Sequence, residues 1–256
     1  MITLRDALGI GDRDVVAFVG AGGKTTAMFR LARELHAGGA KVVVTTTTRI
    51  LIPPSSSDLR VVLERERSAL LASVTSAIAR GSIPVVARET TPDGKLVGIP
   101  PEWVADLVEC PAVTHLLVEA DGAAGKPFKA PREGEPVIPS TATVVVAIVG
   151  VDVLGEPLSE VAHRPEQVMA ITGLGAHDRL DARAIARVIL DPRGGTKGTP
   201  PRARIILLVN KADDPRRVEQ ARELAAEFRR GGAQRVVIAT LEATEAVIEV
   251  RGTETA

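Results

Sequence analysis

The residues best suited to chemistry in this chain form a glycine-rich segment near its start, "GAGGKTT" at 20–26. Glycines let a loop turn tightly so that backbone N–H groups converge on an anion, and a helix that begins there adds its own free N–H groups and its dipole. Lysine in such a loop reaches terminal phosphates, and the hydroxyl after it ligates Mg²⁺. We predict that Lys24 is catalytic, that Thr25 binds the metal, and that phosphates are bound by Gly20, Ala21, Gly22, Gly23, Lys24, Thr25 and Thr26.

The spacing of this loop differs from the common pattern G-x-x-x-x-G-K-S/T, because Phe18 stands where the first glycine should be. The segment fits the shorter pattern G-x-x-G-K-S/T, which resembles the loop of the Mur ligases and folylpolyglutamate synthases. The alternative is a glycine-rich turn between a strand and a helix, with a lysine that only meets solvent. The position between the first apolar run and the first helical pattern favours a phosphate site.

A second candidate lies at the end of the apolar run in "LLVEADG" (116–122). Glu119 and Asp121 are two residues apart, so a continuous strand would present them on one face, where they hold Mg²⁺ directly or through water. We predict that both are catalytic and that Asp121 binds the metal. The alternative for Asp121 is a helix cap or a turn with Gly122.

Four further residues are candidates for a switch or a substrate contact. Lys126 and Lys129 follow the acidic segment, and Thr47 and Thr48 belong to the run "TTTT" at 45–48. The lysines add positive charge near the expected phosphates, and the hydroxyls have the chemistry to position water or a metal. Surface solvation for the lysines, and a preference of threonine for strand ends, explain the same residues equally well.

A third pattern, N-K-x-D, follows the late apolar run "IILLV" and consists of Asn210, Lys211 and Asp213. In GTPases this element reads guanine, because the carboxylate accepts two hydrogen bonds from the base and the lysine stem packs on the purine ring. Adenine lacks that pair of donors and would leave a carboxylate unpaired. The pattern favours GTP, although it leaves GTP or ATP open, and Asp213 or Asp214 before Pro215 also suits a helix N-cap.

Short Val/Ile/Leu runs that alternate with helical patterns must position these motifs. Such runs predict an α/β fold with a mostly parallel β-sheet flanked by helices on both faces, in one domain over 1–256. Ligands of such sheets bind at the carboxyl ends of the strands, where all three motifs lie. Strands are expected at 15–19, 41–46, 83–88, 114–121, 143–151, early in 202–213, and last at 234–241. Helices are expected at 25–39, 68–81, 101–110, 164–173, 181–191 and 215–232.

Composition excludes several classes of partner. Lys+Arg and Asp+Glu are both 32, so no net charge attracts nucleic acid or acidic lipid, and four Phe, one Trp and no Tyr are too few for a base-stacking platform. The lone Cys110 excludes a disulfide framework, and the four histidines have no metal-ligand spacing. The start of the chain lacks the apolar core of a signal peptide, and no run is long enough to span a bilayer, so we expect a cytoplasmic protein without membrane contact.

Together with the motifs, the blocks "VVVTTTTRI" (42–50), "VEADGAAGKPFKAP" (118–131), "HRPE" (163–166) and "GGTKGTP" (194–200) resemble the YqeC-type accessory proteins of selenium-dependent molybdenum hydroxylases. The resemblance implies a P-loop NTPase fold and a client that is a molybdenum hydroxylase or its cofactor. The chain is also similar to the metallochaperone GTPases, which often form a homodimer around nucleotide and couple GTP hydrolysis to the transfer of a metal or cofactor. It departs from several of these in lacking a segment rich in cysteine and histidine for cargo.

Three hypotheses follow for the activity. The first is an Mg²⁺-dependent NTPase that matures a molybdenum hydroxylase by inserting or modifying its cofactor, with slow hydrolysis that the client raises. The second is an ATP-dependent small-molecule kinase or ligase, which the short loop favours. The third is a scaffold that binds nucleotide without turnover. The preferred nucleotide, and the turnover measured in the presence of the client, distinguish these three hypotheses.

Overall fold

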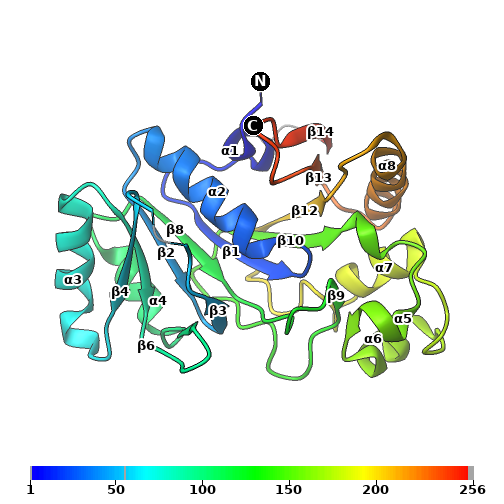
Figure 1. Ribbon diagram of the computed structural model, residues 1–256, viewed down its shortest axis with the longest axis horizontal. Coiled ribbons are helices and arrows are strands. Elements are labelled where there is room, and N and C mark those ends of the chain that lie inside the picture. The colour runs from blue at the N-terminus through cyan, green and yellow to red at the C-terminus, as the bar shows by residue number, and fades with distance from the viewer. Residues whose placement is uncertain (1, 55, 253–256) are drawn as a thin grey trace.

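A nine-stranded sheet forms the centre of the computed structural model, which describes residues 2–54 and 56–252. Its strands follow the order β14-β13-β12-β10-β1-β8-β2-β5-β4, and all neighbours pair in parallel except β13 and β14. Figure 1 shows this sheet running across the molecule. Its strands are β1 (Val15–Gly20), β2 (Val42–Thr46), β4 (Leu59–Leu63), β5 (Ile83–Ala87), β8 (His115–Glu119), β10 (Val144–Gly150), β12 (Arg204–Asn210), β13 (Arg235–Ala239) and β14 (Val247–Gly252).

Strand β1 lies in the middle of the sheet, between β8 and β10. The register places Phe18 opposite Glu119 and Gly20 opposite Ile148. Phe18 is fully buried in the core, so the residue that interrupts the longer loop pattern belongs to the strand and not to the turn. The glycine-rich loop therefore leaves the sheet beside the end of β8, which brings it close to Glu119.

Helices cover both faces of the sheet, as the continuous apolar runs predict. Alternate residues of β1 enter opposite layers of the core: Val16 and Phe18 pack with α1 and α2, whereas Ala17 and Val19 share a cluster with α7 and α8. Helices α3 and α4 cover the β2–β5 end (Figure 1). The helices are α1 (Leu4–Leu8), α2 (Lys24–Ala37), α3 (Arg67–Ala79), α4 (Trp103–Glu109), α5 (Leu158–Val161), α6 (Pro165–Thr172), α7 (Ala182–Leu190) and α8 (Pro215–Arg230), with a 3₁₀ turn at Val151–Val153.

Two small sheets stand at the carboxyl edge of the large one. One contains β3 (Arg49–Leu51), β7 (Lys95–Val97) and β6 (Glu89–Thr90), and the other pairs β9 (Phe128–Lys129) with β11 (Ala162–His163). Both come from segments that connect strands of the large sheet. Residues of β3 and β7 line the cleft described below, whereas Phe128 and Lys129 of β9 line a separate small cavity.

The α/β class and the mostly parallel sheet predicted from the sequence are confirmed, but several elements were not predicted. The expectation that 234–241 holds the last strand is wrong, since β14 follows it as an antiparallel edge strand. Strands β4 and β14 are mostly half-exposed edge strands, so they lack the continuous apolar run of a buried parallel strand. Strand β7 lies in a segment for which neither a strand nor a helix was expected.

Within the described parts of the chain, residues 2–54 and 56–252, no helix has the length and apolar character needed to cross a membrane.

Candidate functional site

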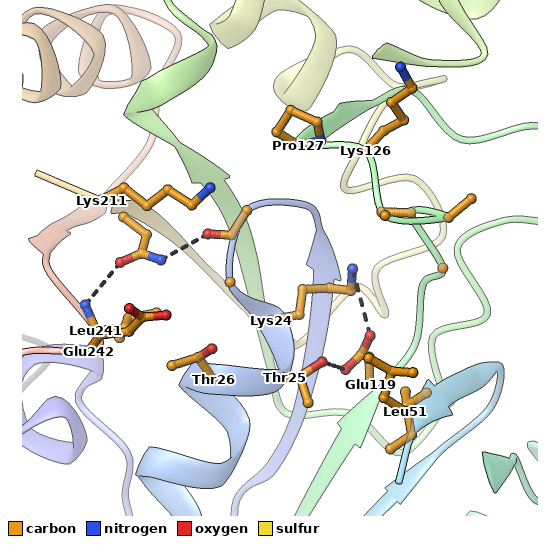
Figure 2. A pocket seen from close by; sticks show the side chains of 18 of the residues that line it. Lys24, Thr25, Thr26, Leu51, Glu119, Lys126, Pro127, Lys211, Leu241 and Glu242 are labelled. Atoms are coloured by element: carbon orange, nitrogen blue, oxygen red, sulfur yellow. Dashed lines mark hydrogen bonds and ion pairs between the residues drawn. The ribbon is translucent and has the colours of Figure 1, made fainter. Parts of the chain in front are cut away.

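An open cleft of about 1090 Å³ runs along the carboxyl edge of the sheet and brings most of the predicted site together. The glycine-rich loop lies in its middle. The N-K-x-D segment lies toward one end, and the segment around Lys126 lies toward the other (Figure 2). The cleft is lined by Gly22–Thr26, Arg49–Leu51, Lys95, Glu119, Gly122–Pro127, Asn210, Lys211, Asp213 and Thr240–Ala243.

The glycine-rich loop presents free backbone donors to this cleft. Helix α2 begins at Lys24, and its N-cap, Gly23, makes no side-chain capping bond. The amides of 22–26 make no hydrogen bond to any other described part of the chain. Gly22 and Gly23 have φ of +87° and +138°, and an added Cβ would lie 2.4 Å from the amide nitrogen of Gly150 or the side chain of Asn210. The close approach therefore requires glycine at both positions, and the uncapped helix start is suited to an anion.

Lys24 and Glu119, both buried, and the half-buried Thr25 form a polar group on the floor of the cleft. The Lys24 ammonium donates to the Gly20 carbonyl at 2.7 Å and lies 3.7 Å from a Glu119 oxygen. The Thr25 hydroxyl donates to the other Glu119 oxygen at 2.8 Å. Burial raises the pKa of Glu119, and Lys24 and Thr25 only partly oppose this effect. A buried lysine held by its own loop, without a full ion pair, is poised to exchange that carbonyl for a phosphate.

The Thr25 hydroxyl and the Glu119 carboxylate fit a magnesium site. Both are hard oxygen ligands, they lie side by side, and they face the cleft beside the free amides of the loop. Mg²⁺ keeps several waters and usually takes only one or two protein carboxylates together with substrate phosphates, so one carboxylate beside one hydroxyl is a donor set that fits it.

Asp121 lies behind the loop and not in the cleft, which corrects its predicted place at the metal. Its oxygens accept hydrogen bonds from the Gly20 amide, at 3.2 Å, and from the Lys129 ammonium. The expectation that it shares a strand face with Glu119 fails because β8 ends at Glu119 and the alternation of side chains ends with it. Asp121 is 1% exposed and lines a separate small cavity.

Asp121, Lys129, Glu135 and Arg164 form a connected group of charges that we call the back cluster. Lys129, predicted as a substrate or switch residue, is buried and also donates to Glu135 at 3.1 Å, and Arg164 donates to Glu135 at 2.6 Å. Burial acts to raise the pKa of Glu135, but hydrogen bonds from Arg164 and Lys129 outweigh it and lower the pKa to about 2. Burial raises the pKa of Asp121 despite Lys129. Because its charges are paired within the protein, this cluster supports the loop from behind.

The remaining switch candidates also divide into residues outside the cleft and a residue that lines it. The Thr47 hydroxyl donates to the Val137 carbonyl at 2.8 Å, and that of Thr48 lies 3.2 Å from the hydroxyl of Thr46. Neither threonine lines the cleft. Lys126 does line it, and its ammonium donates to the Glu160 carbonyl.

The N-K-x-D residues take three different positions. Asn210 is buried, donates to the Gly22 carbonyl at 2.8 Å and accepts from the Leu241 amide at 3.0 Å, so it joins the glycine-rich loop to the segment after β13 (Figure 2). Lys211 pairs with Asp152 at 2.6 Å and still lines the cleft. The Asp213 carboxylate is 46% exposed and pairs with Arg217 at 2.7 Å. Exposed pairs of this kind are weak, so Asp213 remains available to a ligand.

Several lining residues were not predicted from the sequence. Thr240–Ala243 follow β13 at the same end of the cleft as Asn210, and Arg30 of α2 holds this segment by donating to the carbonyls of Leu241 and Ala243. Arg49 and Lys95 come from β3 and β7 at the other end. The position of Thr240–Ala243 after a late apolar run is a signal that the sequence does contain, whereas nothing local marks Arg49 or Lys95.

Comparisons with known proteins found similarity to one protein family. A family model described as "YqeC protein" matches residues 16–166, a range that holds the glycine-rich loop, Glu119 and the back cluster. A protein of Escherichia coli (strain K12) described as "Uncharacterized protein YqeC" is 35% identical over 199 residues, which cover 77% of this chain and 75% of that protein.

Proposed function

The chain belongs to the YqeC family, and we propose that it binds a nucleoside triphosphate with Mg²⁺ in its cleft and hydrolyses the terminal phosphate. One observation carries the proposal. The uncapped start of α2, the Lys24 ammonium and the Thr25–Glu119 pair converge on one open cleft. Free amides, a cation and hard oxygen ligands in one place are what a triphosphate and its metal require.

Within this proposal the loop residues bind the phosphates. Amides of 22–26 receive phosphate oxygens, and Lys24 moves from the Gly20 carbonyl to the terminal phosphate. Thr25 and Glu119 hold Mg²⁺, which neutralises charge on the phosphates when it is bound. Positioned charge lowers the barrier to phosphoryl transfer without covalent chemistry by the protein. Asn210 positions the loop against the segment that follows β13.

The end of the cleft lined by Asn210, Lys211, Asp213 and Thr240–Ala243, which we call the base end, favours guanine over adenine. Asp213 is exposed at the mouth of the cleft and accepts the two donors of a guanine edge once it leaves Arg217. The Lys211 stem and the segment at 240–243 flank the base. GTP is therefore the preferred nucleotide, with ATP as the weaker ligand.

The biological role proposed for this activity follows the YqeC resemblance. Hydrolysis is coupled to the insertion or modification of the cofactor of a selenium-dependent molybdenum hydroxylase. The client enzyme or its cofactor is the partner that raises the slow intrinsic turnover, and a homodimer around the nucleotide is one arrangement for that step. Turnover of GTP with and without the client measures the coupling.

Calorimetric titration of the intact protein with GTP and with ATP, each with Mg²⁺, tests the nucleotide proposal. We expect saturable one-to-one binding that is tighter for GTP and that weakens when Mg²⁺ is removed. Phosphate release at saturating GTP then separates an NTPase from a scaffold. Absence of binding for both nucleotides would contradict the proposal.

One observation favours a second candidate, an ATP-dependent kinase or ligase. The cleft continues past Glu119 into space lined by Arg49, Lys95 and Lys126, beyond what phosphates at the loop would reach. Hydrolysis needs only water there, whereas a kinase or ligase needs a second substrate. Turnover that requires an added small acceptor, with no preference for GTP, would favour this candidate.

A further inference from the structure

The part of the cleft beyond Glu119 has a lining of its own, which we call the distal end: Arg49–Leu51, Lys95 and Gly122–Pro127. Strands β3 and β7 supply one wall, and the loop between β8 and β9 supplies the other. In Figure 2, Leu51 and Lys126 lie on the opposite side of Lys24 from Lys211 and Glu242. The distal end is therefore separate from the base end and adjoins the place proposed for the terminal phosphate.

The lining of the cleft extends beyond the place proposed for the nucleotide. The volume of the open cleft, about 1090 Å³, slightly exceeds the roughly 300–1,000 Å³ of pockets that enclose one drug-sized ligand. A nucleotide that extends from Asp213 to Glu119 occupies the base end and the loop. The distal end then remains open beside its last phosphate.

The charges at the distal end are nearly all positive. Arg49, Lys95 and Lys126 line it, and apart from Glu119 on the floor no carboxylate does, whereas Asp213 and Glu242 accompany Lys211 at the base end. Arg49 has no hydrogen-bond or ion-pair partner among residues 2–54 and 56–252. Lys95 pairs only with the exposed Asp93, at 2.6 Å. Solvated surface cations explain each residue singly, but Arg49 and Lys95 on one wall and Lys126 on the other make this end of the cleft positive, which favours an anion.

The backbone and the apolar side chains complete the distal end. The amides of Gly122–Gly125 make no hydrogen bond to other described residues. Gly122 and Gly125 have open space where a side chain would stand. Leu51 is 65% exposed and faces the cleft with Pro127. An exposed apolar side chain among cations and free amides suits a ligand with an apolar body and an anionic group.

We propose that the distal end binds a second small molecule that carries an oxyanion, either a phosphate or a carboxylate, on a partly apolar body. Arg49 binds the oxyanion through its planar fork of donors, with Lys126 and Lys95 beside it. This inference rests on the proposed function, because it places the second ligand next to the terminal phosphate of a bound nucleotide. The cleft then holds a second substrate, and the anionic group of this substrate orients it beside Lys24 and Glu119.

The test first saturates the protein with Mg²⁺ and a non-hydrolysable GTP analogue, so that the loop is filled and cannot bind the probe. Inorganic phosphate is then titrated in one arm and succinate in the other, while the amide NMR signals of Gly122 and Gly125 are followed. We expect saturable shifts of both signals. The arm with the lower Kd tells whether the natural ligand carries a phosphate or a carboxylate.

Arg49→Gln should weaken binding of the preferred anion at least about tenfold, equivalent to about 1.4 kcal/mol, because the oxyanion loses a charge-assisted donor. The matched control is Arg60→Gln, because Arg60 is an exposed arginine on edge strand β4, away from the cleft. This control variant should leave the Kd of phosphate and of succinate unchanged. Equal effects of the two variants, or no saturable shift with either anion, would overturn the second site. A protein that fails to bind the analogue itself contradicts the proposed function instead.

Discussion

The two sides of the glycine-rich loop contain carboxylates only two residues apart, yet the two are used differently. On the cleft side, Glu119 meets the Thr25 hydroxyl and lies 3.7 Å from Lys24, and it faces open space. On the other side, Asp121 is closed in by the Gly20 amide and by Lys129, both within the protein. The comparison teaches that the partners of a buried carboxylate, more than its spacing, decide whether it is free to meet a ligand.

The two regions should therefore fail in different ways. The back cluster is satisfied by internal pairs, so its loss should lower the stability of the fold. The cleft side keeps free amides and an incompletely paired lysine, so its loss should lower ligand affinity and leave the fold intact. Each prediction below tests one side of this contrast.

The largest effect is expected from Lys129→Met, which leaves Asp121 buried without its cation. Breaking a buried pair by removing one partner costs about 3–5 kcal/mol. Urea unfolding should show a loss of that order relative to Lys41→Met, which changes an exposed lysine at the opposite edge of the sheet. A loss below about 1 kcal/mol would mean that the back cluster does not support the loop.

On the cleft side, Lys24→Ala should lower the affinity for Mg²⁺–GTP at least about 100-fold, equivalent to about 3 kcal/mol. The phosphates lose their charged donor, whereas the unfolding free energy should fall by less than for Lys129→Met, because Lys24 is 3.7 Å from Glu119 and Glu119 keeps the Thr25 hydroxyl as a donor. Calorimetry and urea unfolding on the same samples provide both values, with Lys41→Ala as the control. Unchanged affinity would remove Lys24 from the phosphate site.

Acid should unfold the protein partly through Glu135. The pKa of Glu135 is about 2 in the folded protein, against an ordinary value of 4.5 for the unfolded chain. Its contribution to stability is therefore complete above pH 4.5 and is lost as the pH falls toward 2. The shift sets an upper limit of about 3 kcal/mol. Unfolding free energies measured across this range should fall more steeply for the natural protein than for Glu135→Gln. The exposed Glu133→Gln serves as control. An equal fall in unfolding free energy with pH for the natural protein and Glu135→Gln would contradict the pairing of Glu135 with Arg164 and Lys129.

The smallest effect concerns the pH dependence of nucleotide binding through Glu119. Burial raises the pKa of this carboxyl, so it takes up a proton at a higher pH than an ordinary glutamate does, and protonation removes a metal ligand. Affinity for Mg²⁺–GTP should therefore fall with decreasing pH by at most about tenfold per unit. Because the triphosphate titrates as well, the readout is the difference from Glu119→Gln, which should show the weaker dependence. The same slope in both proteins would exclude Glu119 as a ligand.

The sequence predicts most of the central site because its main elements are local. Gly20–Thr26 follow a buried strand directly, and their geometry depends on neighbours in the chain. The sequence could not show that β8 ends at Glu119, so the predicted common face of Glu119 and Asp121 was wrong. The role of Asn210 between Gly22 and Leu241 depends on three separate strands meeting at one edge. Arg49 and Lys95 reach the cleft only because β3 and β7 pair, and two three-residue strands far apart in the chain give little signal in a single sequence.

The most direct test of the account is a crystal structure of the protein with Mg²⁺ and a non-hydrolysable GTP analogue. The account predicts phosphate oxygens at about 2.7–3.2 Å from amides of residues 22–26. It also predicts that the Lys24 ammonium has left the Gly20 carbonyl for the terminal phosphate. A triphosphate bound elsewhere, or an empty cleft with Lys24 still on Gly20 at saturating analogue, would contradict it.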